Sequence, residues 1–257
     1  MLPSLISTDQ YLSPFFSEKN LIDKAIIVAA GISSRLYPIT SEKPKALLKV
    51  SGKEILKRSI DILRKNGIND IAIVVGYKKD MIIESFEEDI FYITNPFYKI
   101  SNNLASFWLA KSFAGNSPFV YLHSDIIYHE NIISSTLQQF KDNNNNIELV
   151  VDFGSTDKEA MKVIVTEENY LIKSDKKISL DKAGGEWTGI AYVKQPEYLF
   201  KYVEKVLFED GLTNYDSFAF TKMAEEGNKI YCSSTNNFPW IEVDFMEDLE
   251  KAKEMFK

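Results

Sequence analysis

In the first half of the chain, short apolar runs alternate with segments whose apolar residues are spaced as on one face of a helix. This alternation restricts the possible folds more than any other feature. Short apolar runs predict buried strands, and apolar residues at helical spacing predict helices that cover them. The expected elements in chain order are a strand at 24–30, a helix at 53–66, a strand at 71–75, a helix at 79–86, a strand at 90–94, a helix at 103–113 and a strand at 118–123. Strands joined through helices form parallel βαβ units with helices on both faces of the sheet.

The second half of the chain is more mixed. The expected strands lie at 147–153, 161–166, 169–173, 188–193 and 229–233, and a short strand ends at Asp244. The expected helices lie at 130–141, 196–208 and 215–226, and a last helix follows Asp244. We therefore predict one α/β domain over residues 24–257, with a doubly wound, mostly parallel mixed sheet continued by a small α+β lobe. In such sheets, ligands bind at the carboxyl ends of the strands.

Residues 1–23 precede the first predicted strand and are treated as an N-terminal arm. Apolar side chains in this arm predict that it packs on the domain or on a partner subunit, which leaves a homodimer open. These side chains are Leu2, Leu5, Ile6, Phe15 and Phe16. A disordered leader is the alternative interpretation.

Composition excludes several classes of protein. The 257 residues are 45% apolar and 26% charged, which suits a chain with a sizeable core and excludes disorder. A net charge of -7 argues against a nucleic-acid-binding protein. No apolar stretch is long enough to predict a membrane span. Cys232 is the single cysteine, and no Lys or Arg precedes Lys19 to begin a signal peptide, so we expect a cytoplasmic protein.

The stretch from Ala29 to Lys53 contains the residues that most clearly indicate a function. A strand opens into a turn of small residues that ends at Arg35, and Lys45 follows a proline ten residues later. Small residues let backbone N–H groups approach a polyphosphate, and two cations beside such a loop suit phosphoryl or nucleotidyl transfer. Two other phosphate motifs fail: the dinucleotide fingerprint lacks its later glycines, and the single Gly-Lys pair precedes Glu54 instead of Ser or Thr.

The motif AAG-x-x-SRL-x-P-x-T-x-x-x-PKAL-x-x-V-x-GK in this stretch resembles the signature of the sugar-1-phosphate nucleotidyltransferase superfamily. Other segments extend the resemblance along nearly the whole chain: IAIVVGY, NPFYKISNNLASFWLA, HSD and WIEVDFMEDLEKA. The Asn-x-x-Tyr and Asn-x-x-Ser pattern at 95–106, the MKV strand and the GE-x-x-GI turn resemble the branch of LicC-type choline-phosphate cytidylyltransferases and related small-phosphate and phosphonate cytidylyltransferases. Many members of the superfamily have glycine where this chain has Ser33, which leaves the fine geometry of the nucleotide open.

The resemblance implies a Rossmann-like nucleotidyltransferase fold and a role for each matching residue. The implied catalytic residues are Arg35, Lys45, Asp125 and Asp244, and the two aspartates would hold Mg²⁺. The implied nucleotide-binding residues are Ala29, Ala30, Gly31, Ser33, Ser34, Arg35, Lys45, Gly76, Asn103 and Ser106. The implied acceptor-binding residues are Lys162, Glu186 and Trp187, and Tyr128 is added to them as an aromatic candidate for contact with a cationic head group.

Plain structural interpretations compete with several of these roles. Asp125 suits a turn at the end of a strand, and Asp244 suits the cap of the last helix, paired with Glu247. Lys162 suits an exposed strand position. Trp187, Trp240, Tyr128 and Tyr215 could surround a cationic head group, but each is individually more typical of core packing. The two histidines, His123 and His129, are more typical of core or surface positions than of metal ligands.

We therefore expect an Mg²⁺-dependent enzyme that transfers CMP from CTP to a small phosphorylated or phosphonate acceptor, resembling phosphocholine, and releases pyrophosphate. The expected partners are a nucleoside triphosphate, with CTP favoured, and the acceptor, without nucleic acid. Two alternatives stay open. One is a sugar-1-phosphate nucleotidyltransferase that uses UTP, dTTP or GTP, and the other is a non-catalytic nucleotide-binding regulatory domain.

Overall fold

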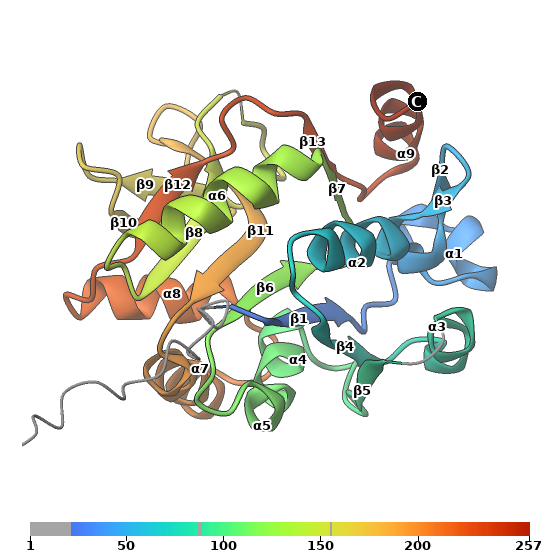
Figure 1. The fold of residues 1–257 in the computed structure, drawn as a ribbon, viewed down its shortest axis with the longest axis horizontal. Helices are drawn as coiled ribbons and strands as arrows, with labels where there is room; N and C mark the ends of the chain where they lie inside the picture. Colours follow the sequence, from blue (N-terminus) through green and yellow to red (C-terminus); the bar gives the residue numbers. More distant parts are fainter. Residues whose placement is uncertain (1–21, 87–88, 155) are drawn as a thin grey trace, which may run out of the picture.

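The computed structural model describes residues 22–86, 89–154 and 156–257. The predicted N-terminal arm lies outside the described residues, apart from its last two positions. Helices cover both faces of a large central sheet (Figure 1). This arrangement confirms the predicted α/β fold class.

Within the described part of the chain, the main sheet has nine strands and mixes parallel with antiparallel pairs. Its path runs through β10 (Leu171–Ser174), β9 (Lys162–Val165), β11 (Gly185–Val193), β6 (Phe119–His123), β1 (Lys24–Ala29), β4 (Asp70–Val75) and β5 (Ile90–Thr94), while β8 (Ile147–Asp152) pairs with β11 and with β12 (Tyr231–Ser234). The pairs β6–β1, β1–β4, β4–β5 and β8–β12 are parallel, and β11 runs antiparallel to β6, β8 and β9. The parallel half therefore contains the strands predicted from the first half of the sequence.

The remaining elements are helices and short ribbons. The α-helices are α1 (Ile39–Glu42), α2 (Ile55–Lys65), α3 (Lys79–Ser85), α4 (Asn103–Leu109), α5 (Lys111–Ala114), α6 (Glu130–Asp142), α7 (Pro196–Asp210), α8 (Ser217–Glu225) and α9 (Met246–Met255). Two 3₁₀ turns, η1 (Ser34–Leu36) and η2 (Lys45–Leu47), follow β1. The short strands are β2 (Lys49–Val50) with β3 (Lys53–Glu54), and β7 (Ile126–Tyr128) with β13 (Trp240–Glu242).

Alternate residues of β1 enter two different hydrophobic layers. Ile26 and Val28 pack in the layer that contains residues of α4, α7 and α8. Ala25 and Ile27 pack in the opposite layer, with residues of α2 and α6. Because successive side chains of a strand point to opposite faces, this alternation places the sheet between two helical layers.

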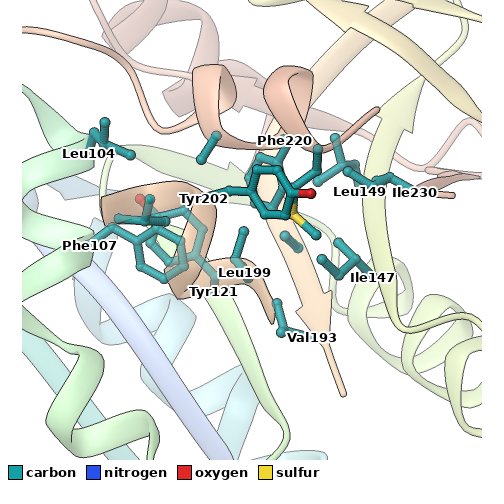
Figure 2. Close-up of a cluster of buried hydrophobic side chains, with 14 of the residues drawn as sticks. Leu104, Phe107, Tyr121, Ile147, Leu149, Val193, Leu199, Tyr202, Phe220 and Ile230 are labelled. Atoms are coloured by element: carbon teal, nitrogen blue, oxygen red, sulfur yellow. The ribbon is translucent and has the colours of Figure 1, made fainter. Parts of the chain in front are cut away.

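Aromatic side chains join the two halves of the sequence in the first of these layers (Figure 2). Phe107 of α4 lies 4.2 Å from Tyr121 of β6 and 5.1 Å from Phe200 of α7, measured between ring centroids. Phe220 of α8 belongs to the same layer. The late helices therefore share one core with the early strands.

Several expected elements differ from the structure in their bounds. The helix expected at 103–113 is divided into α4 and α5 at Ala110, whose N–H bonds to Phe107 in a tight turn. The helix expected at 53–66 begins only at Ile55, because the two residues before it pair with β2. The last strand ends at Glu242, before Asp244. None of the described helices is long and apolar enough to cross a membrane.

Candidate active site

A cavity of about 340 Å³ opens at the carboxyl ends of β1, β5 and β6. Its walls come from both halves of the sequence: the loop after β1 lines it together with residues of β11 and β13, with Met161 before β9 and with Asp244 before α9. The lining residues are Val28, Ala29, Ala30, Gly31, Ser33, Ser34, Arg35, Pro44, Lys45, Ala46, Asn95, Tyr98, Ser101, Asn102, Asn103, Ser106, His123, Ser124, Asp125, Met161, Lys176, Thr188, Gly189, Tyr215, Glu242 and Asp244. This position is where doubly wound sheets bind ligands.

The loop after β1 turns sharply at Ser33. This residue has a left-handed backbone with φ of 55°, and its carbonyl accepts hydrogen bonds from the Thr40 hydroxyl at 2.8 Å and from the Leu36 N–H. A left-handed backbone costs a serine more than a glycine, which explains the physical preference for glycine at such a position. The two external hydrogen bonds hold the serine loop in this conformation.

Lys45 lies at the charged floor of the cavity, between two aspartates. Its Nζ is 2.9 Å from Asp125 Oδ2 and 2.8 Å from Asp244 Oδ1, and Arg35 binds the other oxygen of Asp244 at 3.0 Å. Burial opposes the charge of Lys45, but the two carboxylates outweigh burial and raise its pKa. Burial likewise opposes the charge of Asp125, and Lys45 is the main cause that lowers its pKa. The four predicted charged residues, Arg35, Lys45, Asp125 and Asp244, therefore form one network.

Asp216 and His123 form a second buried polar group, in which His123 lines the cavity and Asp216 lies behind it. Asp216 is fully buried at the start of α8, and its Oδ2 lies 2.7 Å from His123 Nε2 and 2.5 Å from the Tyr121 hydroxyl. The Asp216 N–H donates to Asn103 Oδ1 at 3.0 Å. Burial disfavours a charged His123, but Asp216 outweighs it and raises the pKa of this histidine to about 9.

Glu242 is a third carboxylate in the cavity. Burial is the main cause that raises its pKa to about 7, and the charges of Asp125 and Asp244 add to the effect. Glu242, Asp125 and His123 each place one potential ligand atom within 4.8 Å of the other two. A cation at this point would relieve the repulsion among the carboxylates.

Sequence reasoning missed His123, Asp216 and Glu242 as members of the site. Two of them carried a usable signal: His123 and Glu242 each precede a predicted aspartate by two positions, and residues two apart in an extended chain face the same side. Asp216 carried none, because its neighbours in space are about a hundred residues away in the chain.

The structure brings most of the predicted nucleotide-binding residues to the cavity wall. Ala29, Ala30, Gly31, Ser33 and Ser34 line it together with the two cations, and so do Asn103 and Ser106. Gly76 is not part of the lining. It packs behind the wall, where an added Cβ would lie 2.8 Å from both the Ala30 carbonyl oxygen and Tyr98 Cβ.

The structure does not bring the four predicted acceptor-binding residues to the cavity, although all four are described. Lys162 is buried, and its Nζ donates to the carbonyls of Asp157, Lys158 and Ala160. Trp187 packs in the core, with Nε1 bonded to the Ile190 carbonyl at 2.8 Å.

Tyr128 and Glu186 also lie away from the lining. Tyr128 is the last residue of β7, where it pairs with Trp240 of β13, and its side chain packs in the opposite core layer. Glu186 lies on β11, where burial is the main cause that raises its pKa to about 8. Tyr215 is the one predicted aromatic candidate that lines the cavity, and Lys176 Nζ lies 5.5 Å from its ring centroid.

Comparison with known proteins agrees with this geometry. Residues 24–202 match the family model described as nucleotidyl transferase. The CTP:phosphoglutamine cytidylyltransferase of Campylobacter jejuni is 25% identical over 88% of this chain and 97% of its own. The choline-phosphate cytidylyltransferase of Streptococcus pneumoniae is 28% identical over 91% of this chain and 98% of its own.

Solved structures show the same fold. The inositol-1-phosphate CTP transferase from T. maritima superposes with a TM-score of 0.78 over 91% of this chain and 95% of its own, at 24% identity. The match of the family model covers more than half of the chain. The protein is therefore a member of the nucleotidyl transferase family of enzymes.

Proposed function

We propose that this enzyme transfers CMP from CTP to a small phosphorylated or phosphonate acceptor and releases pyrophosphate. The observation that carries the proposal is the joint placement of Arg35, Lys45, Asp125 and Asp244 in one cavity at the carboxyl ends of the parallel strands. The two cytidylyltransferases that align with most of this chain support the choice of CTP.

The wall formed by the loop after β1 suits the triphosphate. Small side chains at Gly31, Ser33 and Ser34 leave backbone N–H groups accessible to phosphate oxygens, and an added Cβ at Gly31 would meet no atom within 4 Å. Arg35, whose side chain is 46% exposed, reaches over the same opening and can bind phosphate oxygens through its planar fork. Asn103 and Ser106 of α4 also line the cavity and offer polar groups to the nucleoside.

Lys45 would stabilise the charge that develops at the α-phosphate during transfer. Its carboxylate partners keep it protonated, and burial strengthens its field in the cavity. An oxygen of the acceptor phosphate or phosphonate would attack the α-phosphorus while the bond to pyrophosphate breaks. The acceptor itself supplies the nucleophile, so the residues of the chain position and stabilise without a covalent intermediate.

The carboxylates of the floor fit a divalent cation such as Mg²⁺, held by Asp125 together with Asp244 or Glu242. Within the described structure, the Oδ1 atom of Asp125 is buried and has no hydrogen-bond partner. Mg²⁺ prefers oxygen ligands and binds few protein groups in nucleotide sites. When bound, it would neutralise charge on the phosphate oxygens.

Pyrophosphate release tests this function. The enzyme is incubated with Mg²⁺ and each of CTP, UTP, dTTP and GTP, against phosphocholine, other phosphorylated small molecules, phosphonates and sugar 1-phosphates. We expect release with CTP and a non-sugar acceptor. Release with UTP, dTTP or GTP and a sugar 1-phosphate would reassign the substrate pair, and tight CTP binding without release by any pair would favour a regulatory domain.

A further inference from the structure

The part of the cavity lining that comes from residues 95–106 is uncharged, in contrast to the floor around Lys45. It consists of five polar residues and one tyrosine: Asn95, Tyr98, Ser101, Asn102, Asn103 and Ser106. The charged floor suits phosphate groups, whereas a neutral wall with a few fixed polar groups suits a nucleotide base, which is uncharged and has hydrogen-bonding groups along its edge. The hydrogen bonds of this wall therefore bear on the choice of base.

Asn95 fixes the direction of these hydrogen bonds. Its Oδ1 lies 2.8 Å from the backbone nitrogen of Phe97, and a backbone N–H can only donate, so the other end of the amide is its NH₂ group. This group donates to the hydroxyl oxygen of Ser106 at 2.9 Å and to that of Ser101 at 3.2 Å. Asn95 is only 1% exposed, and its amide cannot turn over without losing all three bonds.

Each of the two serine hydroxyls is left with one hydrogen to donate. A hydroxyl carries a single hydrogen, and both oxygens already accept from Asn95. Within the described structure, no protein group accepts the hydrogen of Ser101 or Ser106, and both residues line the cavity. Ser106 is only 4% exposed, so a ligand that offers it no acceptor leaves this hydrogen buried and unpaired, which lowers affinity.

We infer that Ser106 selects cytosine by donating to N3 of the base, and that Asn95 is the positioning residue that keeps the Ser106 hydroxyl a donor. In cytosine N3 accepts a hydrogen bond, whereas in uracil and thymine the same nitrogen carries a hydrogen and donates. Uracil bound in the same way would leave the Ser106 hydrogen without an acceptor. O2 accepts in all three bases, so a bond from Ser101 to O2 would not distinguish them. The inference rests on the proposed function and adds the group that decides between CTP and UTP.

Nucleotide binding in the absence of acceptor tests the inference. Calorimetric titration with CTP and with UTP, each with Mg²⁺, compares the wild type with Ser106→Ala and with the matched control Ser59→Ala, which changes a buried serine of α2 outside the cavity lining. We expect the wild type and the control to bind CTP roughly 10-fold or more tightly than UTP. Ser106→Ala should lose most of this preference through weaker binding of CTP. A wild type without a preference for CTP, or a Ser106→Ala variant with the wild-type ratio, overturns the inference.

A modified base identifies the atom in the wild-type enzyme, independently of any effect of a variant on folding. In 3-deaza-CTP a C–H group replaces N3, so the wild type should bind it roughly 10-fold more weakly than CTP. Ser106→Ala should bind the two nucleotides equally. Equal binding by the wild type would show that N3 is not recognised and would overturn the inference.

Asn95→Asp tests the positioning role by reversing the hydrogen bonds. A carboxylate only accepts, so both serines would donate to residue 95 and present their oxygen atoms to the base. We expect the ratio of CTP to UTP affinity to move toward UTP, which a general loss of stability would not cause, and an unchanged ratio would contradict the role of Asn95. CTP-selective binding without pyrophosphate release by any acceptor would refute only the proposed function. Release from CTP, with an unchanged affinity ratio in Ser106→Ala, would refute only the role of Ser106.

Discussion

Lys45 is the residue that compensates the acidic side chains of the cavity floor. Its side chain is buried among three acidic groups, two of which it touches directly. Removing one member of a buried ion pair leaves the remaining charges without compensation. Lys45 therefore serves both the electrostatics of the folded cavity and the proposed stabilisation of the reacting phosphate.

Replacing Lys45 with Met should lower the rate of pyrophosphate release by about 10²–10³-fold, because a preorganised charge in a water-poor site contributes that much to transfer. The matched control is Lys49→Met, since the side chain of Lys49 is exposed and pairs with Glu54 at the surface. Single-turnover release at saturating CTP and acceptor measures the effect. A Lys45→Met rate within about threefold of the control would contradict the catalytic role of this lysine.

At the scale of the element, β11 connects the two halves of the sheet. It pairs with β6 on one side and with β8 and β9 on the other, so it spans the junction between the parallel and antiparallel parts. Glu186 lies near the start of this strand. Burial, with the nearby charge of Glu242, raises its pKa to about 8.

The raised pKa of Glu186 predicts how stability changes with pH. The folded state binds the proton more tightly than the unfolded state, so the free energy of unfolding falls as pH rises from about 4.5 to about 8. Glu186→Gln removes this loss and should raise the Tm at pH 8 by a few degrees, since about 1 kcal/mol shifts Tm by about 2–4 °C in a chain of this size.

Thermal melts at pH 5, 6.5 and 8 measure this difference against an exposed control, Glu168→Gln. The gap in Tm between Glu186→Gln and the wild type should widen with pH, while the control should follow the wild type. A constant gap would show that the effect of Glu186 is not electrostatic.

The sequence predicted the elements whose own residues determine them. The apolar runs of β1, β4 and β6 lie within one or two residues of their expected bounds, because a strand buried on both faces is apolar throughout. The strands β7 and β13 were harder to predict, since each is three residues long and exists through pairing with the other across more than a hundred residues.

The candidate site also contains residues that the sequence predicts and residues that it does not. Arg35, Lys45, Asp125 and Asp244 were recognisable from motifs, and the structure places them in contact. The sequence could not show which aromatic residues line the cavity, because whether Trp187 or Tyr215 faces it depends on the register of strands and helices that meet only in the folded chain. The local sequence around an aromatic residue looks the same whether its side chain faces the cavity or packs in the core.

At the scale of the whole molecule, one sheet and one shared core join the early and late parts of the chain. The layer that contains Ile26 and Val74 of the parallel strands also contains Val193 and Phe220. A core that is continuous across both halves predicts a single cooperative unfolding transition.

Thermal unfolding of residues 24–257 should therefore give coincident transitions by far-UV circular dichroism and by tryptophan fluorescence. The three tryptophans lie in α4, β11 and β13, so they report on separate parts of the fold. Addition of CTP should raise both midpoints together, because a ligand that binds only the folded state stabilises it by mass action. Two separated transitions would divide the chain into independent domains.

The contact between Lys45 and Asp244 joins residues 199 positions apart, and β7 pairs only with β13 in the described structure. During synthesis, a chain that has emerged as far as α8 already has Lys45 and Asp125 but lacks Glu242 and Asp244. Its β7 then lacks the strand with which it pairs, and the loop after β1 faces a cavity floor without Glu242 and Asp244. We therefore expect the charged floor of the cavity to be complete only after this last segment has been synthesised and has folded.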